Sequence, residues 1–164
     1  MTLMKTLAVV TVGLAVGATV TAGQGTANGT ATLKSRKGPV TVTFTHAAAV
    51  AGPDVLEAPI RRLVLSTTDV SAALKACESM LKCSDGGIRE GLTLDLGHEP
   101  RHGFWFVAND QLVQHSGVVR PETVVLTTDT PTRIAGTFTL DQQASGGPVV
   151  QVTFDAPIVK TLGK

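Results

Sequence analysis

The sequence predicts a mainly β fold, an antiparallel β-sandwich or barrel of about eight strands with one short α-helix after the third strand. Three observations support this prediction. Threonine and valine dominate the chain after residue 22, and apolar residues in its short segments alternate with period two. Turn-forming residues such as Gly38-Pro39 separate these segments. The regular alternation of strands with long helical patterns, which indicates a doubly wound parallel sheet, is absent.

The first three strands are expected before residue 67. Residues 30–34 and 40–45 should form a hairpin, with valine and phenylalanine on its buried face and threonine on the other. Residues 46–59 form a longer segment that contains a Gly-Pro-Asp turn. Residues 60–66 are the third predicted strand.

One helix is expected next. Thr68 or Asp69 can cap its first turn, and it should end near Lys82, before a Gly-Gly pair. Its apolar residues recur at helical spacing: Val70, Leu74, Cys77 and Leu81. Six more strand-like segments follow, at residues 92–96, 103–108, 112–120, 123–127, 133–141 and 148–154.

The first 22 residues are typical of an export signal. Lys5 supplies a positive charge, an uncharged apolar stretch follows, and Val20-Thr21-Ala22 offers small residues for cleavage. A secreted or periplasmic protein is therefore expected, with no stable membrane anchor after cleavage. The predicted organisation is a signal peptide (residues 1–22), a flexible leader (residues 23–28) and a single β-rich domain (residues 29–164).

The charge balance argues against two kinds of partner. The chain has 14 Lys and Arg and 13 Asp and Glu, and removal of residues 1–22 takes away Lys5 and leaves 13 of each sign. A balanced chain lacks the clustered positive charge that binds nucleic acid or an anionic membrane surface. The densest basic stretch, residues 34–37, is expected to be a solvated hairpin turn.

The two cysteines, Cys77 and Cys83, are expected to form a disulfide, as an even pair in an exported protein usually does. On a continuous helix, a separation of six residues would place their Cα atoms about 9 Å apart, beyond the ~7 Å that a disulfide spans. The helix must therefore end before Cys83 if the bond forms.

The segment His98–His102 (HEPRH) matches the H-E-x-x-H pattern, in which two histidines on a helix bind zinc and the glutamate polarises the bound water. Glycines bracket the segment here, and Pro100 disfavours a helix. A polar hairpin loop is the leading interpretation. The alternative is a loop-borne metal site at His98 and His102, with His46 or His115 as a third ligand.

Phe104, Trp105 and Phe106 occupy one strand-like segment. The two phenylalanines are expected to face the core, which makes the outward Trp105 a candidate ligand surface. Ser116 follows His115, but no nucleophile motif surrounds it, and glycine motifs for phosphates or dinucleotides are absent. The sequence therefore predicts no catalytic residue and no cofactor.

Two parts of the chain resemble small exported bacterial all-β domains of unassigned function. These parts are the LVLS strand that enters a short helix at Asp69, and the ending GTFTLDQQASGGPVVQVTFDAP. The order of segments is similar as well: a strand, a segment rich in histidine and alanine, IRRLVLSTTDVSAALK, LTLDLG and this ending, which together span most of the chain after residue 22. The resemblance implies export and an all-β domain, and it implies no activity. The cysteine pair and the segment His98–His102 are not among the shared features.

These observations favour an exported, non-enzymatic β domain that binds a small ligand or a protein partner in the cell envelope or outside the cell. The alternative is a metal-dependent hydrolase or metal-binding protein that uses His98 and His102, with Glu99 as the general base. A third hypothesis is an inhibitor or accessory factor that presents the loop between Cys77 and Cys83 to a partner.

Overall fold

The computed structural model describes residues 24–85, 88–108 and 111–163. Within these residues, nine strands form one sheet in the order β6-β5-β4-β3-β2-β1-β9-β8-β7, and neighbours in this order run antiparallel. This confirms the predicted fold class, with nine strands in place of about eight. The predicted signal peptide, residues 1–22, lies outside the described residues.

The strands are β1 (Thr26–Ser35), β2 (Gly38–Pro53), β3 (Pro59–Ser66), β4 (Gly91–Leu96), β5 (Arg101–Ala108), β6 (Gln111–Val118), β7 (Val124–Thr130), β8 (Arg133–Asp141) and β9 (Val149–Thr161). The helices are short: α1 (Ser71–Ala76), α2 (Lys82–Asp85), η1 (Pro121–Thr123) and η2 (Gln143–Ser145). In the part of the chain that the structure covers, no helix is both long and apolar enough to cross a membrane.

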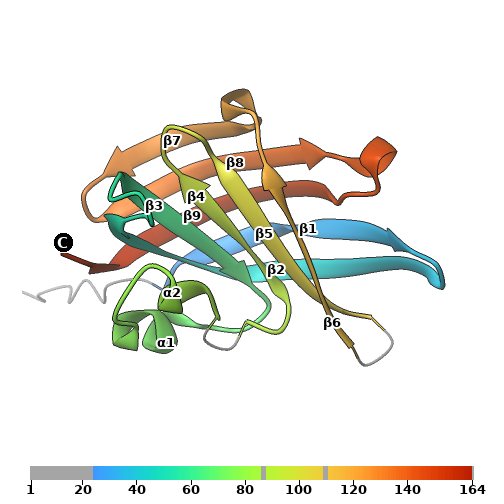
Figure 1. The fold of residues 1–164 in the computed structure, drawn as a ribbon, viewed down its shortest axis with the longest axis horizontal. Helices are drawn as coiled ribbons and strands as arrows, with labels where there is room; N and C mark the ends of the chain where they lie inside the picture. The colour runs from blue at the N-terminus through green and yellow to red at the C-terminus, as the bar shows by residue number, and fades with distance from the viewer. Residues whose placement is uncertain (1–23, 86–87, 109–110, 164) are drawn as a thin grey trace, which may run out of the picture.

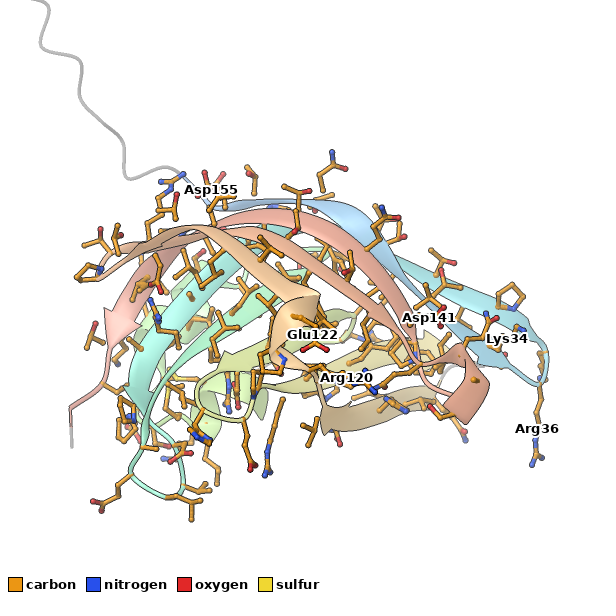
Figure 2. All side chains as sticks on the ribbon, turned by 90° about the horizontal axis from the view of Figure 1, so that it is seen from above. Lys34, Arg36, Arg120, Glu122, Asp141 and Asp155 are labelled. Carbon is orange, nitrogen blue, oxygen red and sulfur yellow. A yellow bond between two sulfur atoms is a disulfide. The ribbon has the colours of Figure 1, made fainter. Side chains whose placement is uncertain are left out.

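The long strand β2 folds the sheet into two layers. Residues 38–46 of β2 pair with β1, and residues 46–53 pair with β3. The second half also meets the end of β9 in parallel, where Ala49 pairs with Ile158. Figure 2 shows β7, β8, β9 and β1 lying over the layer formed by β3, β4, β5 and β6. The sheet does not close into a barrel, because β6 and β7 remain at its two ends.

Two apolar clusters result from this arrangement. The inner core lies between the layers and contains the largest buried side chains, among them Phe44, Leu63, Leu94, Phe104, Phe106, Ile134, Phe138 and Phe154. The helix-side cluster lies where α1 and α2 cover the outer face of β2 and β3 (Figure 1), and it consists of Ala48, Val50, Val64, Leu74, Cys77, Met80 and Cys83.

The structure extends two strands beyond their expected ends. β2 continues through residues 46–53, which we expected to form a separate segment, and β9 continues through Pro157 to Thr161. Ala47 and Ala49 of β2 face the inner core while Ala48 and Val50 face the helix-side cluster. Because both faces are buried, this half of β2 lacks the polar alternation that identifies a strand.

Three other expectations need correction. The helix ends at Ala76 rather than near Lys82, and Met80 is buried in place of Leu81, which is exposed. β1 begins at Thr26, so residues 26–28 belong to a strand and not to a flexible leader. The basic stretch, in contrast, lies at the β1–β2 turn as expected, and Figure 2 shows Lys34 and Arg36 at the tip of that hairpin.

Candidate functional site

A hollow that we call the end cleft opens between the two layers near the β2–β3 turn. Its volume is about 1060 Å³. The apolar side chains that line it come from both layers and from the connections beside them: Ile60, Leu96, Pro100, Pro121, Val124, Leu126 and Leu162. A hollow of this size, with mostly apolar walls, is typical of a site for a small organic ligand.

The end cleft exists because the sheet stays open. Leu96 ends β4, and Val124 and Leu126 lie on the edge strand β7; all three pack against the inner core yet remain partly exposed. The alternation that buries apolar residues along a strand continues to the strand ends, where no opposing layer covers them. The cleft is therefore an open end of the inner core.

Polar groups lie at the rim of the end cleft. Arg61 of β3 forms an ion pair with Asp129 of β7, in which Nη2 donates to Oδ2 at 2.9 Å, so this pair joins the two layers beside the opening. Glu57 and His98 also line the cleft. The opening thus combines apolar walls with a rim that carries the Arg61–Asp129 ion pair and the carboxylate of Glu57.

The β2–β3 turn forms a wall shared with a second hollow. In this turn, Oδ1 of Asp54 accepts hydrogen bonds from the backbone N–H groups of Leu56 and Ala58, both at 2.8 Å. The second hollow, of about 910 Å³, lies toward α2 and is lined in part by Arg62 and Asp95, which pair in a bidentate manner at 2.6 and 2.7 Å. This ion pair satisfies the charges of both groups. Glu57, Glu78, Glu99 and Arg101 also line the second hollow, so its wall is more charged than that of the end cleft.

The segment that matched the zinc-protease pattern is not helical. His98 and Glu99 are exposed in the bend between β4 and β5, whereas His102 lies on β5 and is only 2% exposed. The ring that His102 contacts belongs to His115, one of the two expected third ligands. Within the described residues, no three His, Cys, Asp or Glu side chains gather to hold a metal ion. A metal site at His98 and His102 therefore stays a prediction.

His102 and His115 lie beside each other on the inner face of β5 and β6, where His102 is buried and His115 is half-buried. Nε2 of His102 lies 3.5 Å from Nδ1 of His115, and the ring centroids are 5.6 Å apart. Two glycines leave room for the rings: a β-carbon at Gly117 would lie 3.1 Å from Cε1 of His102, and one at Gly147 would lie 3.1 Å from Cε1 of His115. Nδ1 of His102 has no hydrogen-bond partner among the described residues.

Burial keeps His102 neutral. It lowers the pKa of this imidazole from 6.5 to about 4, because the charged form would lose its hydration. The neighbouring His115 lowers this pKa further through charge repulsion, while the backbone at Gly117 acts in the opposite direction. His102 is therefore uncharged at neutral pH. It resembles a buried polar residue of the core more than a general acid or base, whose pKa would lie near the working pH.

The remaining candidate residues lie apart from this pair. His46 contacts the hydroxyl of Thr45 at 2.8 Å through Nδ1. Ser116 is exposed on the face of β6 opposite to His115, so the two side chains cannot act as a nucleophile and its base. Trp105 faces away from the inner core as expected and covers Gly103, whose β-carbon would lie 2.8 Å from its ring.

The two cysteines behave as the sequence predicts. A disulfide joins Cys77 to Cys83, their Cα atoms are 5.2 Å apart, and the helix that precedes Cys77 ends at Ala76. Both cysteines are buried in the helix-side cluster. The loop that they close is thus anchored to the sheet.

Sequence reasoning missed the walls of the end cleft. Leu96, Val124 and Leu126 read as ordinary inward residues of strands, and only their positions near strand ends gave a signal. It also left open which histidines pair, because that depends on the β5–β6 register that sets Phe104 opposite His115. No family model, no curated protein and no solved structure matches this chain.

Proposed function

We propose that this protein is an exported, non-enzymatic binding domain that holds a small apolar ligand in the end cleft. The observation that supports the proposal is the cleft itself, about 1060 Å³ in volume, with apolar walls from both layers. The export-signal pattern of residues 1–22 and the disulfide between Cys77 and Cys83 support a location outside the cytoplasm.

The chemistry of the cleft favours an uncharged ligand. Its walls include Leu96, Val124 and Leu126, so an apolar ligand gains affinity there by leaving water. The rim cation Arg61 is already paired with Asp129, and a charged ligand would have to compete with that ion pair. A compact, mainly hydrocarbon molecule with one or two polar atoms fits these walls and this rim.

The metal-dependent hydrolase is the weaker candidate. It needs three ligands and an open position for water, whereas His98 lies at the rim of the end cleft and His102 is buried beside His115. Hydrolytic turnover by the purified protein, abolished by His98→Ala, would reverse this order of preference.

A fluorescence titration with Nile red, an uncharged apolar dye, tests the proposed site. We expect saturable binding to the unmodified protein. Leu126→Gln places an amide in the cleft wall and should weaken binding at least about tenfold, because the contact area of a leucine is worth about 1.5–3 kcal/mol. Val125→Gln is the matched control, since Val125 is the neighbouring residue on β7 and is 58% exposed.

The control variant should bind the dye as the unmodified protein does. Thermal unfolding curves of all three proteins establish that the substitutions leave the fold intact. Absence of saturable binding, or equal weakening by both substitutions in folded protein, would show that the end cleft is not the binding site.

A further inference from the structure

The edge strand β6 is unprotected. Within the described residues it pairs only with β5, and Figure 1 shows it at the end of the layer formed by β3, β4 and β5. Its sequence, QLVQHSGV, contains no Lys, Arg, Asp, Glu or Pro. Edge strands usually carry such residues, or a bulge, because a regular edge presents unpaired N–H and C=O groups to another strand.

The other edge strand, β7, is built differently. Its pairing with β8 is irregular between Leu126 and Thr128, and its Asp129 forms an ion pair with Arg61. A bulge and a charged residue are two of the devices that block edge-to-edge pairing. The contrast shows that the fold obstructs one edge and leaves the other available.

The side chains of β6 are self-complementary. On its outer face, the two large apolar residues are Leu112, which is 59% exposed, and Val118, which is 60% exposed. When two copies of β6 run antiparallel with His115 at the centre, Leu112 of each copy lies opposite the partner's Val118. Gln114 then lies opposite the partner's Ser116, which places amide beside hydroxyl.

This register is the one that matches the side chains. A shift by one residue would set outward side chains of one copy against inward side chains of the other. A shift by two residues would place Leu112 opposite Ser116 or opposite Arg120, and Val118 would lose its apolar neighbour. The pairing that buries both exposed apolar residues is therefore the one centred on His115.

We propose that two copies of this chain associate through β6, as antiparallel strands in the register centred on His115. The contact extends the layer of each copy across a two-fold axis and leaves the end cleft outside the contact. A single strand pair is small compared with the interface of a permanent dimer. The dissociation constant should therefore be on the order of 10–100 μM.

Sedimentation velocity with two oppositely charged variants tests both the association and its register. One variant carries Leu112→Lys with Val118→Lys, and the other carries Leu112→Glu with Val118→Glu. Each variant alone places like charges opposite each other twice, so its dimer should weaken at least about tenfold. An equimolar mixture sets each lysine opposite a glutamate and should restore the dimer.

Val125→Lys is the matched control, because Val125 is almost equally exposed, at 58%, but lies on β7. It should dimerise as the unmodified protein does. Circular dichroism checks that every variant is folded. If a double variant does not fold, the single variant Leu112→Lys replaces it, and we expect it to lose an intermediate amount of dimer affinity.

Three results would overturn the proposal. The first is that the unmodified protein stays monomeric at concentrations well above the expected dissociation constant. Binding of an extended peptide along β6 by such a monomer would overturn the proposal in the same way. The second is undiminished dimerisation of both charged variants. The third is a mixture of the two variants that remains monomeric.

Discussion

The inner core and the helix-side cluster are both apolar, but different forces hold them together. The inner core joins buried side chains from seven strands, with partly buried residues of β6 and β7 packed against them, and it includes five fully or almost fully buried phenylalanines: Phe44, Phe104, Phe106, Phe138 and Phe154. The helix-side cluster consists of small and medium side chains under a helix of six residues. Burial of area is sufficient for the first cluster. The second depends on specific links.

Those links are covalent and polar. The disulfide between Cys77 and Cys83 closes the loop between α1 and α2. The guanidinium of Arg62 donates to the backbone carbonyl of Met80. The ammonium of Lys160, on β9, donates to the carbonyl of Lys75 at 3.0 Å and also to that of Cys77. The comparison shows that a short helix with little area to bury is held on a sheet by a disulfide and by hydrogen bonds from two cationic side chains, Arg62 and Lys160.

The largest expected effect comes from the inner core. Phe138→Ala should lower the free energy of unfolding by about 3–5 kcal/mol, because it removes a fully buried ring and leaves a cavity between two layers. Leu74→Ala, the matched change in the helix-side cluster, should cost about 2 kcal/mol, since α1 can settle onto the sheet. Urea unfolding measures both values. Equal losses would remove the distinction between the two clusters.

The next effect concerns His102, the buried histidine on the inner face of β5. Below pH 6.5 the unfolded chain binds a proton at His102, while the folded protein, with its pKa of about 4, does not. Stability should therefore fall as the pH decreases from about 6.5 to about 4, by about 3 kcal/mol in total, and should not fall further through this group at lower pH. Urea unfolding at a series of pH values measures the slope.

Two variants isolate this contribution. His102→Leu removes the titrating group and should flatten the slope between pH 6.5 and pH 4. His98→Gln changes an exposed histidine in the β4–β5 bend and should leave the slope unchanged. An identical slope in unmodified protein and His102→Leu would contradict the assignment of acid sensitivity to this buried imidazole.

The smallest of the three effects is that of the disulfide. Replacing Cys77 and Cys83 by serine should lower the free energy of unfolding by about 2 kcal/mol, because the closed loop is short. Hydrogen exchange should show that the loss of stability is local to the disulfide, with faster amide exchange in α1 and little change in β5 or β8. Uniformly faster exchange would mean that the disulfide stabilises the whole sandwich rather than the helix-side cluster.

The sequence was informative where one face of a strand is buried and the other is exposed. Residues 40–44 and 133–141 alternate clearly; the first range lies in β2, and the second is β8 with its expected bounds. The second half of β2 could not be recognised, because both of its faces are covered. The predicted helix was too long because Val70, Leu74, Cys77 and Leu81 have helical spacing, and the disulfide requires only that the helix end before Cys83, whereas it ends at Ala76.

The candidate sites depended on contacts that local patterns do not contain. Four separate parts of the chain build the end cleft, and its volume follows from the failure of the sheet to close. The H-E-x-x-H pattern drew attention to His98 and His102, yet the strand geometry gives these residues different environments. Alternation alone places His102 on the same face as Phe104, but its contact with His115 depends on the pairing with β6.

The position of β9 affects how the chain can fold during its synthesis. This last strand lies between β1 and β8 and also touches β2, so the beginning and the end of the domain are neighbours in one sheet. A growing chain that lacks β9 leaves β1 and β8 without the strand that joins them. Folding must therefore wait for almost the whole polypeptide, and its reliance on distant contacts makes it slow.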